Sequence, residues 1–144
     1  MKINQAMTRA VRTAAPDATI RDAAKMMIEG DVGLLPVEEN DRLIGMITDR
    51  DIAVRAVAEG KGPDASVREV MSGDVKYCYE DEDVETVCRN MGDIRVRRLP
   101  VVSRDKRLVG IVSLADIAAN GTSAMAGQAL GGITQKGAPH SQRA

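Results

Sequence analysis

The 144-residue sequence has almost no aromatic side chains: it contains no Trp and no Phe, and Tyr77 and Tyr79 are its only Tyr residues. Any hydrophobic core must therefore be built from aliphatic side chains and from the eight Met residues, which adapt to irregular gaps. Proteins that bind single-stranded nucleic acid stack the bases on aromatic rings. The near absence of such rings argues against this class of function.

An excess of charge of one sign is also missing. Twenty Lys and Arg residues face 21 Asp and Glu residues, which leaves a formal net charge of −1. Because nucleic-acid-binding proteins usually carry a basic excess, we expect no nucleic-acid partner. No apolar run approaches the roughly 20 residues that cross a bilayer, and the N-terminal stretch MKINQAMTRAV lacks the apolar region of a signal peptide. We therefore expect no membrane association and a cytoplasmic location.

Side chains suited to metal binding and covalent catalysis are scarce. Cys78 and Cys88 are the only cysteines and lie in no Cys or His cluster, so we interpret both as reduced structural thiols. The single histidine, His140, lies in a polar C-terminal stretch that offers no nucleophile–base pair. Asp49 and Asp51 lack the third ligand of a calcium loop. The sequence predicts a protein that is not an enzyme and that requires no metal or cofactor.

What the sequence has instead is an internal repeat. The stretch GMITDRDIA at 45–53 returns as GIVSLADIA at 110–118, and the tripeptide LPV at 35–37 returns at 99–101. Repetition at a nearly fixed offset indicates one structural unit that is used twice.

The repeat defines the domain organisation. We place the first repeat at residues 3–58 and the second at 67–120, joined by the Gly- and Pro-containing linker EGKGPDAS at 59–66. Residues 121–144 are small and polar enough to form a flexible C-terminal tail, with at most a short docking turn. Because each half is too short to bury much surface alone, the two repeats should pack into one globular module.

Each repeat predicts the same order of elements. Residues 20–29 form an amphipathic helix whose apolar side chains recur three and four positions apart: Ile20, Ala23, Ala24, Met27 and Ile28. The stretches LLPVE (34–38) and LIGMIT (43–48) predict a hairpin, and DRDIAVRAVAE (49–59) predicts a closing helix. A short strand at 11–14 precedes the first helix. The repeat unit is therefore β-α-β-β-α, an α/β fold.

A hydroxyl residue is followed three positions later by Asp in both copies, as Thr48–Asp51 and as Ser113–Asp116. Each pair lies where a strand ends and a helix begins. One interpretation is a capping box, in which both side chains accept hydrogen bonds from backbone N–H groups. The other is a ribose site, because a hydroxyl and a carboxylate together can bind the vicinal hydroxyls of a ribose. The spacing alone leaves both interpretations open.

The complete pattern resembles the cystathionine β-synthase (CBS) domain family, and in particular a tandem pair of CBS domains, called a Bateman module. The resemblance rests on LLPVEENDRLIGMITDRDIA and RRLPVVSRDKRLVGIVSLADIA, on the MT and MS openings at Met7 and Met71, and on the order of elements over residues 3–120. It implies two β-α-β-β-α repeats that pack with pseudo-two-fold symmetry through their sheets. It also implies a regulatory module that binds adenosine-containing ligands in clefts between the repeats.

The nucleotide-binding residues that the resemblance implies lie at the two hydroxyl-x-x-Asp motifs or directly before the LPV tripeptides: Thr48, Arg50, Asp51, Ser113, Asp116, Gly33, Leu34, Arg97 and Arg98. In the family, residues before LPV in one repeat reach the nucleotide held by the Asp of the other. Arg97 and Arg98 are therefore expected near Asp51, where their planar guanidinium groups would bind phosphate. The alternative is that RVRR is a solvated strand edge.

The expected ligand is AMP, ADP or ATP, with NAD and S-adenosylmethionine as alternatives. Met26 lies off the apolar stripe of its helix, and paired CBS modules commonly associate through exposed helices, so we also expect a homodimer. The sequence does not identify a regulated partner protein. The competing hypothesis is a structural dimerisation or protein-interaction module without a physiological nucleotide, in which the Thr and Asp residues act only as helix caps.

Overall fold

The computed structural model describes residues 1–120 and 123–134. The chain forms two compact units: Arg12–Val75, here called the first-repeat unit, and Met1–Val11 together with the chain from Lys76 onward, here called the second-repeat unit. The units therefore differ from the sequence repeats at their beginnings. The segment that opens each repeat packs with the body of the other repeat.

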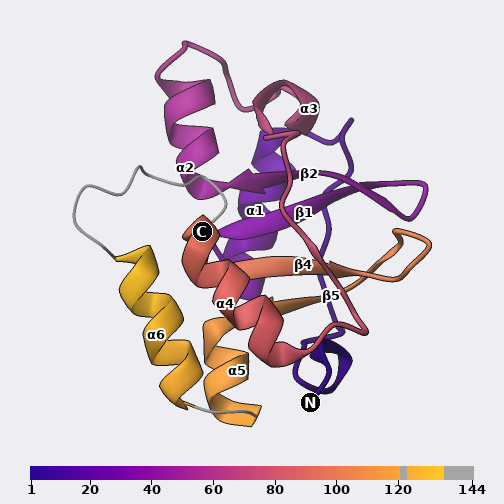
Figure 1. The fold of residues 1–144 in the computed structure, drawn as a ribbon. Coiled ribbons are helices and arrows are strands. Elements are labelled where there is room, and N and C mark those ends of the chain that lie inside the picture. Colours follow the sequence, from indigo (N-terminus) through magenta and orange to yellow (C-terminus); the bar gives the residue numbers. More distant parts are fainter. Residues whose placement is uncertain (121–122, 135–144) are drawn as a thin grey trace. The chain divides into compact units, whose positions relative to one another are not determined.

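The first-repeat unit contains a hairpin and its helices. Its elements are α1 (Ile20–Gly30), β1 (Leu34–Glu39), β2 (Arg42–Thr48), α2 (Asp49–Asp51) with its π-helical continuation η2 (Ile52–Val57), and α3 (Val67–Val70) (Figure 1). Strands β1 and β2 pair antiparallel, with Leu35 opposite Ile47. These elements confirm the predicted helix, hairpin and closing helix. The predicted strand at 11–14 is reduced to one parallel bridge between Ala14 and Val37.

The second-repeat unit repeats this arrangement and adds a helix. Its elements are η1 (Ile3–Gln5), β3 (Cys78–Tyr79), α4 (Val84–Ile94), β4 (Arg98–Val102), β5 (Leu108–Ser113), α5 (Leu114–Asn120) and α6 (Ser123–Ile133). The sheet order is β3-β4-β5, with β3 parallel and β5 antiparallel to β4. The protein is thus a mixed α/β fold with two sheets, as the sequence predicts.

Helix α1 differs from its predicted apolar stripe at one end. Ile20, Ala23 and Met27 are buried as expected, but Ile28 is 81% exposed. Met26, which the sequence places off the stripe, is half-buried and packs against the core of its unit. The predicted stripe was therefore wrong at two positions. Ile28 borders a surface cavity instead of the core, and Met26 packs against the core in its place.

The motif glycine of the first repeat lies under a crossing chain segment. A Cβ at Gly45 would lie 2.7 Å from the Met71 sulfur and 2.8 Å from the Ser72 carbonyl oxygen. Met46 and Ser72 bridge the two segments through reciprocal backbone hydrogen bonds of 2.9 and 2.8 Å. Only glycine leaves room for this close approach.

The second repeat has the same crossing. A Cβ at Gly110 would lie 2.8 Å from both the Met7 sulfur and the Thr8 carbonyl oxygen. Thr8 and Ile111 exchange backbone hydrogen bonds of 2.8 and 2.9 Å. The Met residues of the MT and MS openings therefore cover the motif glycine of the opposite repeat.

Both cysteines are free and buried, which confirms the prediction of structural thiols. Burial raises the pKa of the Cys78 thiol to about 12. The Cys88 thiol donates a hydrogen bond of 3.2 Å to the Met125 carbonyl oxygen, and burial raises its pKa. Neither group has the lowered pKa of a reactive thiol.

Helix α6 corrects the prediction of a flexible tail for the part of 121–144 that the structure describes. Ser123–Ile133 is helical, and Ala126 and Ala129 are buried in the core of the second-repeat unit. These apolar residues follow a helical spacing, and the small size of the neighbouring residues allows close packing. Residues 121–122 and 135–144, including His140, lie outside the described residues.

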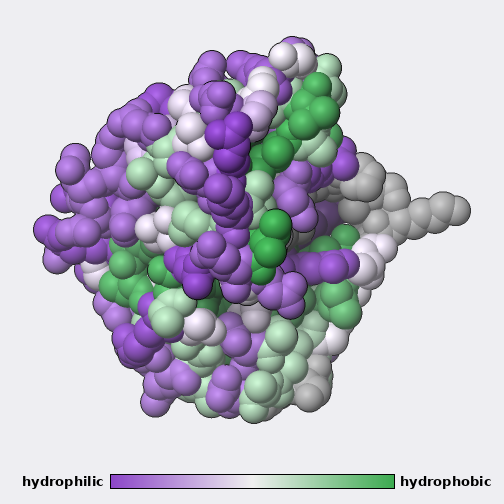
Figure 2. Space-filling model, turned by 180° about the vertical axis from the view of Figure 1, so that it is seen from behind, coloured by the Kyte–Doolittle hydropathy of each residue, from purple (hydrophilic) through white to green (hydrophobic). Residues whose placement is uncertain are grey.

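One face of the protein is largely polar. On the face shown in Figure 2, hydrophilic residues predominate and hydrophobic residues lie in small, separate patches. Across the described residues, no helix has the length and apolar character to cross a bilayer.

Candidate functional site

The first hydroxyl-x-x-Asp motif forms the turn between β2 and α2. The Asp51 Oδ2 accepts a hydrogen bond of 2.9 Å from the Thr48 backbone N–H, and the Thr48 hydroxyl accepts one of 3.0 Å from the Asp51 N–H. This is the reciprocal geometry of a capping box, and it confirms the structural interpretation. It occupies only one of the two Asp51 carboxylate oxygens.

The other oxygen, Asp51 Oδ1, is buried and has no hydrogen-bond partner among the described residues. The Asp51 side chain as a whole is fully buried. Burial raises the pKa of the Asp51 carboxyl, and it outweighs the hydrogen bonds from Thr48 and the positive charges of Arg55 and Arg50, which lower it. A buried acceptor without a hydrogen bond costs free energy of folding. A ligand that donates a hydrogen bond to Oδ1 would offset this cost.

The second motif repeats the cap with a more accessible carboxylate. The Asp116 Oδ2 accepts from the Ser113 N–H at 3.0 Å, and the Ser113 hydroxyl accepts from the Asp116 N–H at 3.1 Å. Asp116 is half-buried. The two copies therefore share their hydrogen bonds but differ in how far the Asp is removed from water.

A cavity of about 350 Å³ lies beside the second motif, within the second-repeat unit. We call it the β4–α6 cavity. Its polar lining consists of Arg97, Arg98 and Ser113, and its other lining residues are small or apolar: Leu114, Ala115, Ala118, Ala126, Gly127 and Leu130. Arg98 and Ser113 are partners across β4 and β5. With guanidinium groups and no lining carboxylate, this cavity suits an anion that has an apolar body.

The first-repeat unit has a cavity of its own, of about 510 Å³, whose charged lining residues are acidic. Asp31 and Asp49 line it, together with Gly33 and Ile28. A Cβ at Gly33 would lie 2.9 Å from the Asp49 Oδ2, so a larger residue here would displace the Asp49 side chain. In the second repeat Arg97 stands at the position of Gly33 and Leu114 at that of Asp49, which reverses the charge.

Two further predicted residues, Leu34 and Arg50, lie in the first-repeat unit. Leu34 is 5% exposed within β1, and Arg50 is exposed on the first turn of α2. The structure brings Arg97 and Arg98 together with Ser113 of their own repeat. Their expected pairing with Asp51 joins residues of the two units and stays a prediction.

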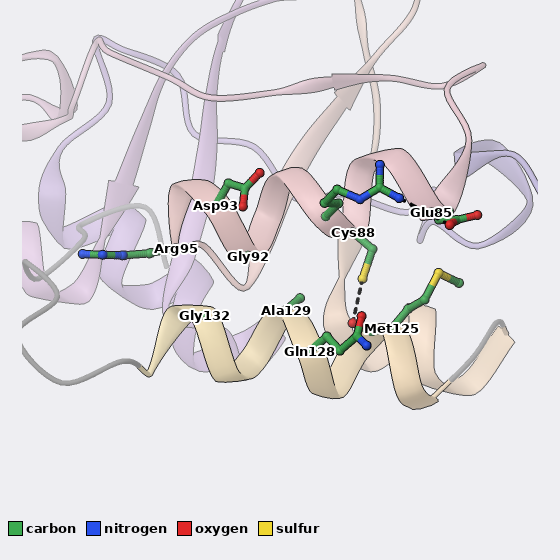
Figure 3. Close-up of a pocket in the computed structure, with 10 residues that line it drawn as sticks. Glu85, Cys88, Gly92, Asp93, Arg95, Met125, Gln128, Ala129 and Gly132 are labelled. Carbon is green, nitrogen blue, oxygen red and sulfur yellow. Dashed lines mark hydrogen bonds and ion pairs between the residues drawn. The ribbon is translucent and has the colours of Figure 1, made fainter.

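A third cavity, of about 410 Å³, runs along α4 and α6. Figure 3 shows Glu85, Asp93 and Arg95 around it, with Cys88 hydrogen-bonded to Met125 beneath. Because its acidic and basic side chains are mixed, and Arg89 pairs with Glu85 at 3.4 Å, this groove has no net preference for an anion.

The sequence interpretation missed the α6 residues of the β4–α6 cavity. The helical spacing of Ala126, Ala129 and Leu130 was the signal that could have revealed them. In the described ranges 1–120 and 123–134, no group of three or more His, Cys, Asp or Glu side chains is arranged to hold a metal ion.

A family model for the CBS domain matches residues 3–57 and again residues 67–121. The chain is 40% identical over 135 residues to the CBS domain-containing protein YhcV of Bacillus subtilis, which covers 93% of this chain and 96% of that protein. It is 39% identical over 114 residues to hypoxic response protein 1 of Mycobacterium tuberculosis, which covers 78% of this chain and 79% of that protein.

Solved structures of CBS-domain proteins also superpose on this chain. The crystal structure of Hypoxic Response Protein I with two coordinated zinc ions superposes with a TM-score of 0.75 at 36% identity, covering 83% of this chain and 98% of that chain. The CBS domain pair of protein MJ0100, in complex with 5′-methylthioadenosine and S-adenosyl-L-methionine, superposes with a TM-score of 0.71 at 32% identity, covering 83% and 94%.

Proposed function

Because this chain belongs to the CBS domain family and carries two CBS domains in tandem, we propose that it is a non-enzymatic regulatory module that binds an adenosine-containing ligand. The observation that carries the proposal is the buried Asp51 carboxylate, whose Oδ1 has no partner among the described residues. The complex of the similar MJ0100 domain pair with two adenosyl compounds supports the ligand class.

The chemistry of the motif fits the ribose of such a ligand. A carboxylate oxygen in a buried site accepts strong hydrogen bonds from hydroxyl donors, and the Thr48 hydroxyl still has its own proton to donate. The vicinal hydroxyls of a ribose would give Asp51 Oδ1 the donor that the protein does not supply. Within the adenosine class, the guanidinium groups of the β4–α6 cavity favour phosphorylated members, namely AMP, ADP or ATP.

A ligand panel tests this function directly. At a ligand concentration ten times the dissociation constant, an adenine nucleotide should raise the free energy of unfolding by about 1.4 kcal/mol. The panel contains AMP, ADP, ATP, NAD, S-adenosylmethionine and 5′-methylthioadenosine, with CMP and UMP as controls, and the melting temperature is the readout. If no adenosine compound stabilises the protein more than CMP and UMP do, the proposed function is wrong.

A role in dimerisation is a second candidate that one observation favours. Ile28 on α1 and Val57 on η2 are 81% and 68% exposed, which is unusual for large aliphatic side chains. We propose that the protein is a homodimer with Ile28 in its interface.

Ile28→Asp should weaken this dimer without unfolding the protein. Burying an aliphatic side chain at an interface contributes about 1.5–3 kcal/mol, so the dimer dissociation constant should rise at least about tenfold. Lys25→Asp, at an exposed polar position of the same helix, is the matched control. Light scattering on a sizing column gives the mass of each variant. A wild-type monomer, or an unchanged dimer in Ile28→Asp, contradicts the proposal.

A further inference from the structure

Helix α6 lies beyond both matched CBS domains and yet lines the cavity that holds Arg97 and Arg98. Arg97, which directly precedes β4, and the strand residues Arg98 and Ser113 form one side of the β4–α6 cavity. Helix α5 contributes Ala115 and Ala118, and the side formed by α6 consists of Ala126, Gly127 and Leu130. A site assembled only from the repeat would have no wall on this side.

We propose that α6 is part of the ligand site of the second repeat, and that a phosphorylated adenosine compound binds between the two arginines and this helix. The inference rests on the proposed function and adds to it the residues that contact the ligand and the segment that responds to it. The phosphate would lie at the guanidinium groups, and the apolar part of the ligand would lie against Ala126 and Leu130. Cavities of about 300–1,000 Å³ typically hold small-molecule ligands, and this one, at about 350 Å³, falls in that range.

The wall residues leave surface for a ligand to cover. Ala126 is 8% exposed and belongs to the core, whereas Leu130 is 44% exposed. A Cβ at Gly127 would meet no heavy atom within 4 Å, so the helix backbone is open at that point. Neither Arg97 nor Arg98 forms an ion pair with a carboxylate among the described residues, so both guanidinium groups are available to an anion.

A different face of α6 attaches the helix to α4. Figure 3 shows Gly92 on α4 facing Ala129 and Gly132 on α6. A Cβ at Gly92 would lie 3.1 Å from the Ala129 Cα, and a Cβ at Gly132 would lie 2.9 Å from the Gly92 carbonyl oxygen. The two helices are therefore in backbone contact at glycines, and a side chain at Gly132 must push them apart.

Because the attachment face and the ligand face differ, docking of α6 can be changed without changing the cavity residues. A ligand that contacts the docked helix stabilises the docked state. By the same linkage, displacement of the helix lowers the affinity for the ligand. Because apolar contact contributes about 25 cal/mol per Å², we expect the loss of the helix contact to lower the affinity by about tenfold.

The test compares Gly132→Leu with Gly131→Leu. The two variants place the same side chain on neighbouring positions of one helix, but a Cβ at Gly131 meets no heavy atom within 4 Å. Isothermal calorimetry measures AMP and adenosine binding, and hydrogen exchange measures backbone protection of residues 123–134. In the wild type and in Gly131→Leu, AMP should increase this protection. In Gly132→Leu the AMP affinity should fall about tenfold and the increase in protection should be lost.

A second variant keeps the test decisive if Leu at position 132 fits without displacing α6. Leu130→Ser changes the wall itself at a largely exposed side chain, and it should weaken AMP several-fold. Unchanged AMP affinity in both Gly132→Leu and Leu130→Ser overturns the role of α6 and leaves the proposed function intact. Absence of AMP binding in the wild type overturns this inference, whereas the proposed function is wrong only if no adenosine compound of the ligand panel binds.

Discussion

Asp51→Ala is expected to weaken the binding of AMP and of adenosine at the first motif alike by at least about 100-fold, and to leave AMP binding in the β4–α6 cavity unchanged. Both ligands carry the ribose whose two hydroxyls would donate to the Asp51 carboxylate. A hydrogen bond to a charged group contributes about 1.5–3 kcal/mol, so losing two of them costs about 3 kcal/mol or more. Isothermal calorimetry with both ligands measures the effect, and equal losses for the two would point to the ribose instead of the phosphate.

The stability of the ligand-free protein should change little in the same variant. Alanine removes the capping bond between Asp51 and the Thr48 N–H, which costs about 1 kcal/mol. It also removes a buried carboxylate oxygen that has no partner among the described residues, and this relieves a desolvation penalty. The two effects oppose each other, so urea unfolding should show a net change below about 1 kcal/mol.

Asp116→Ala is the matched control, because the same residue lies in the same capping geometry with a half-buried carboxylate. Because the Asp116 carboxylate is only half-buried, its removal relieves little desolvation penalty. The loss of the cap should therefore destabilise the protein by about 1 kcal/mol. AMP affinity at the first motif should fall less than in Asp51→Ala. If Asp116→Ala abolishes AMP binding and Asp51→Ala does not, the roles of the two motifs are reversed.

The raised pKa of Asp51 also predicts a pH dependence. The folded protein holds the Asp51 proton more tightly than the unfolded chain does, because burial disfavours the carboxylate. Its contribution to the free energy of unfolding is therefore fully present below the unfolded-state pKa of about 3.9, and it is lost as pH rises through the folded-state pKa. Relative to Asp51→Asn, the wild type should lose stability as pH rises over this window. Urea unfolding of both proteins at a series of pH values measures the difference.

Gly45→Val should destabilise the first-repeat unit by about 3 kcal/mol, the upper part of the range for overpacking a filled site. The first carbon of the new side chain would lie 2.8 Å from the backbone oxygen of Ser72, which cannot move without breaking the bridge to Met46. Urea unfolding followed by circular dichroism gives the change in the free energy of unfolding.

Gly73→Val is the control for this prediction. A Cβ at Gly73 meets no heavy atom within 4 Å, and its φ lies outside the left-handed region. The control therefore adds the same side chain near the same crossing without a clash, and its stability should stay within about 0.5 kcal/mol of the wild type. Equal losses in both variants would show that the crossing at Gly45 has no special role.

Local patterns in the sequence were sufficient to predict the helices and strands of the repeat unit. The apolar spacing from Ile20 predicted α1, the two apolar runs around a turn predicted the β1–β2 hairpin, and Thr48–Asp51 predicted a helix cap. Each of these features depends on residues a few positions apart, so their side chains and backbone groups meet whatever the rest of the chain does. The family resemblance rested on the same short-range features, and it named the residues at which a ligand is now proposed.

Tertiary structure alone decided which of these residues are buried, unpartnered or close to a distant segment. Periodicity marks Ile28 as part of an apolar stripe, but only the packing of its unit leaves it exposed. The motif shows that Asp51 caps a helix, but not that one of its oxygens is buried without a partner among the described residues. Helix α6 depends on Gly92, far away in the sequence, for its attachment. The sequence pattern states which face of an element is apolar, and only long-range contacts determine what covers that face.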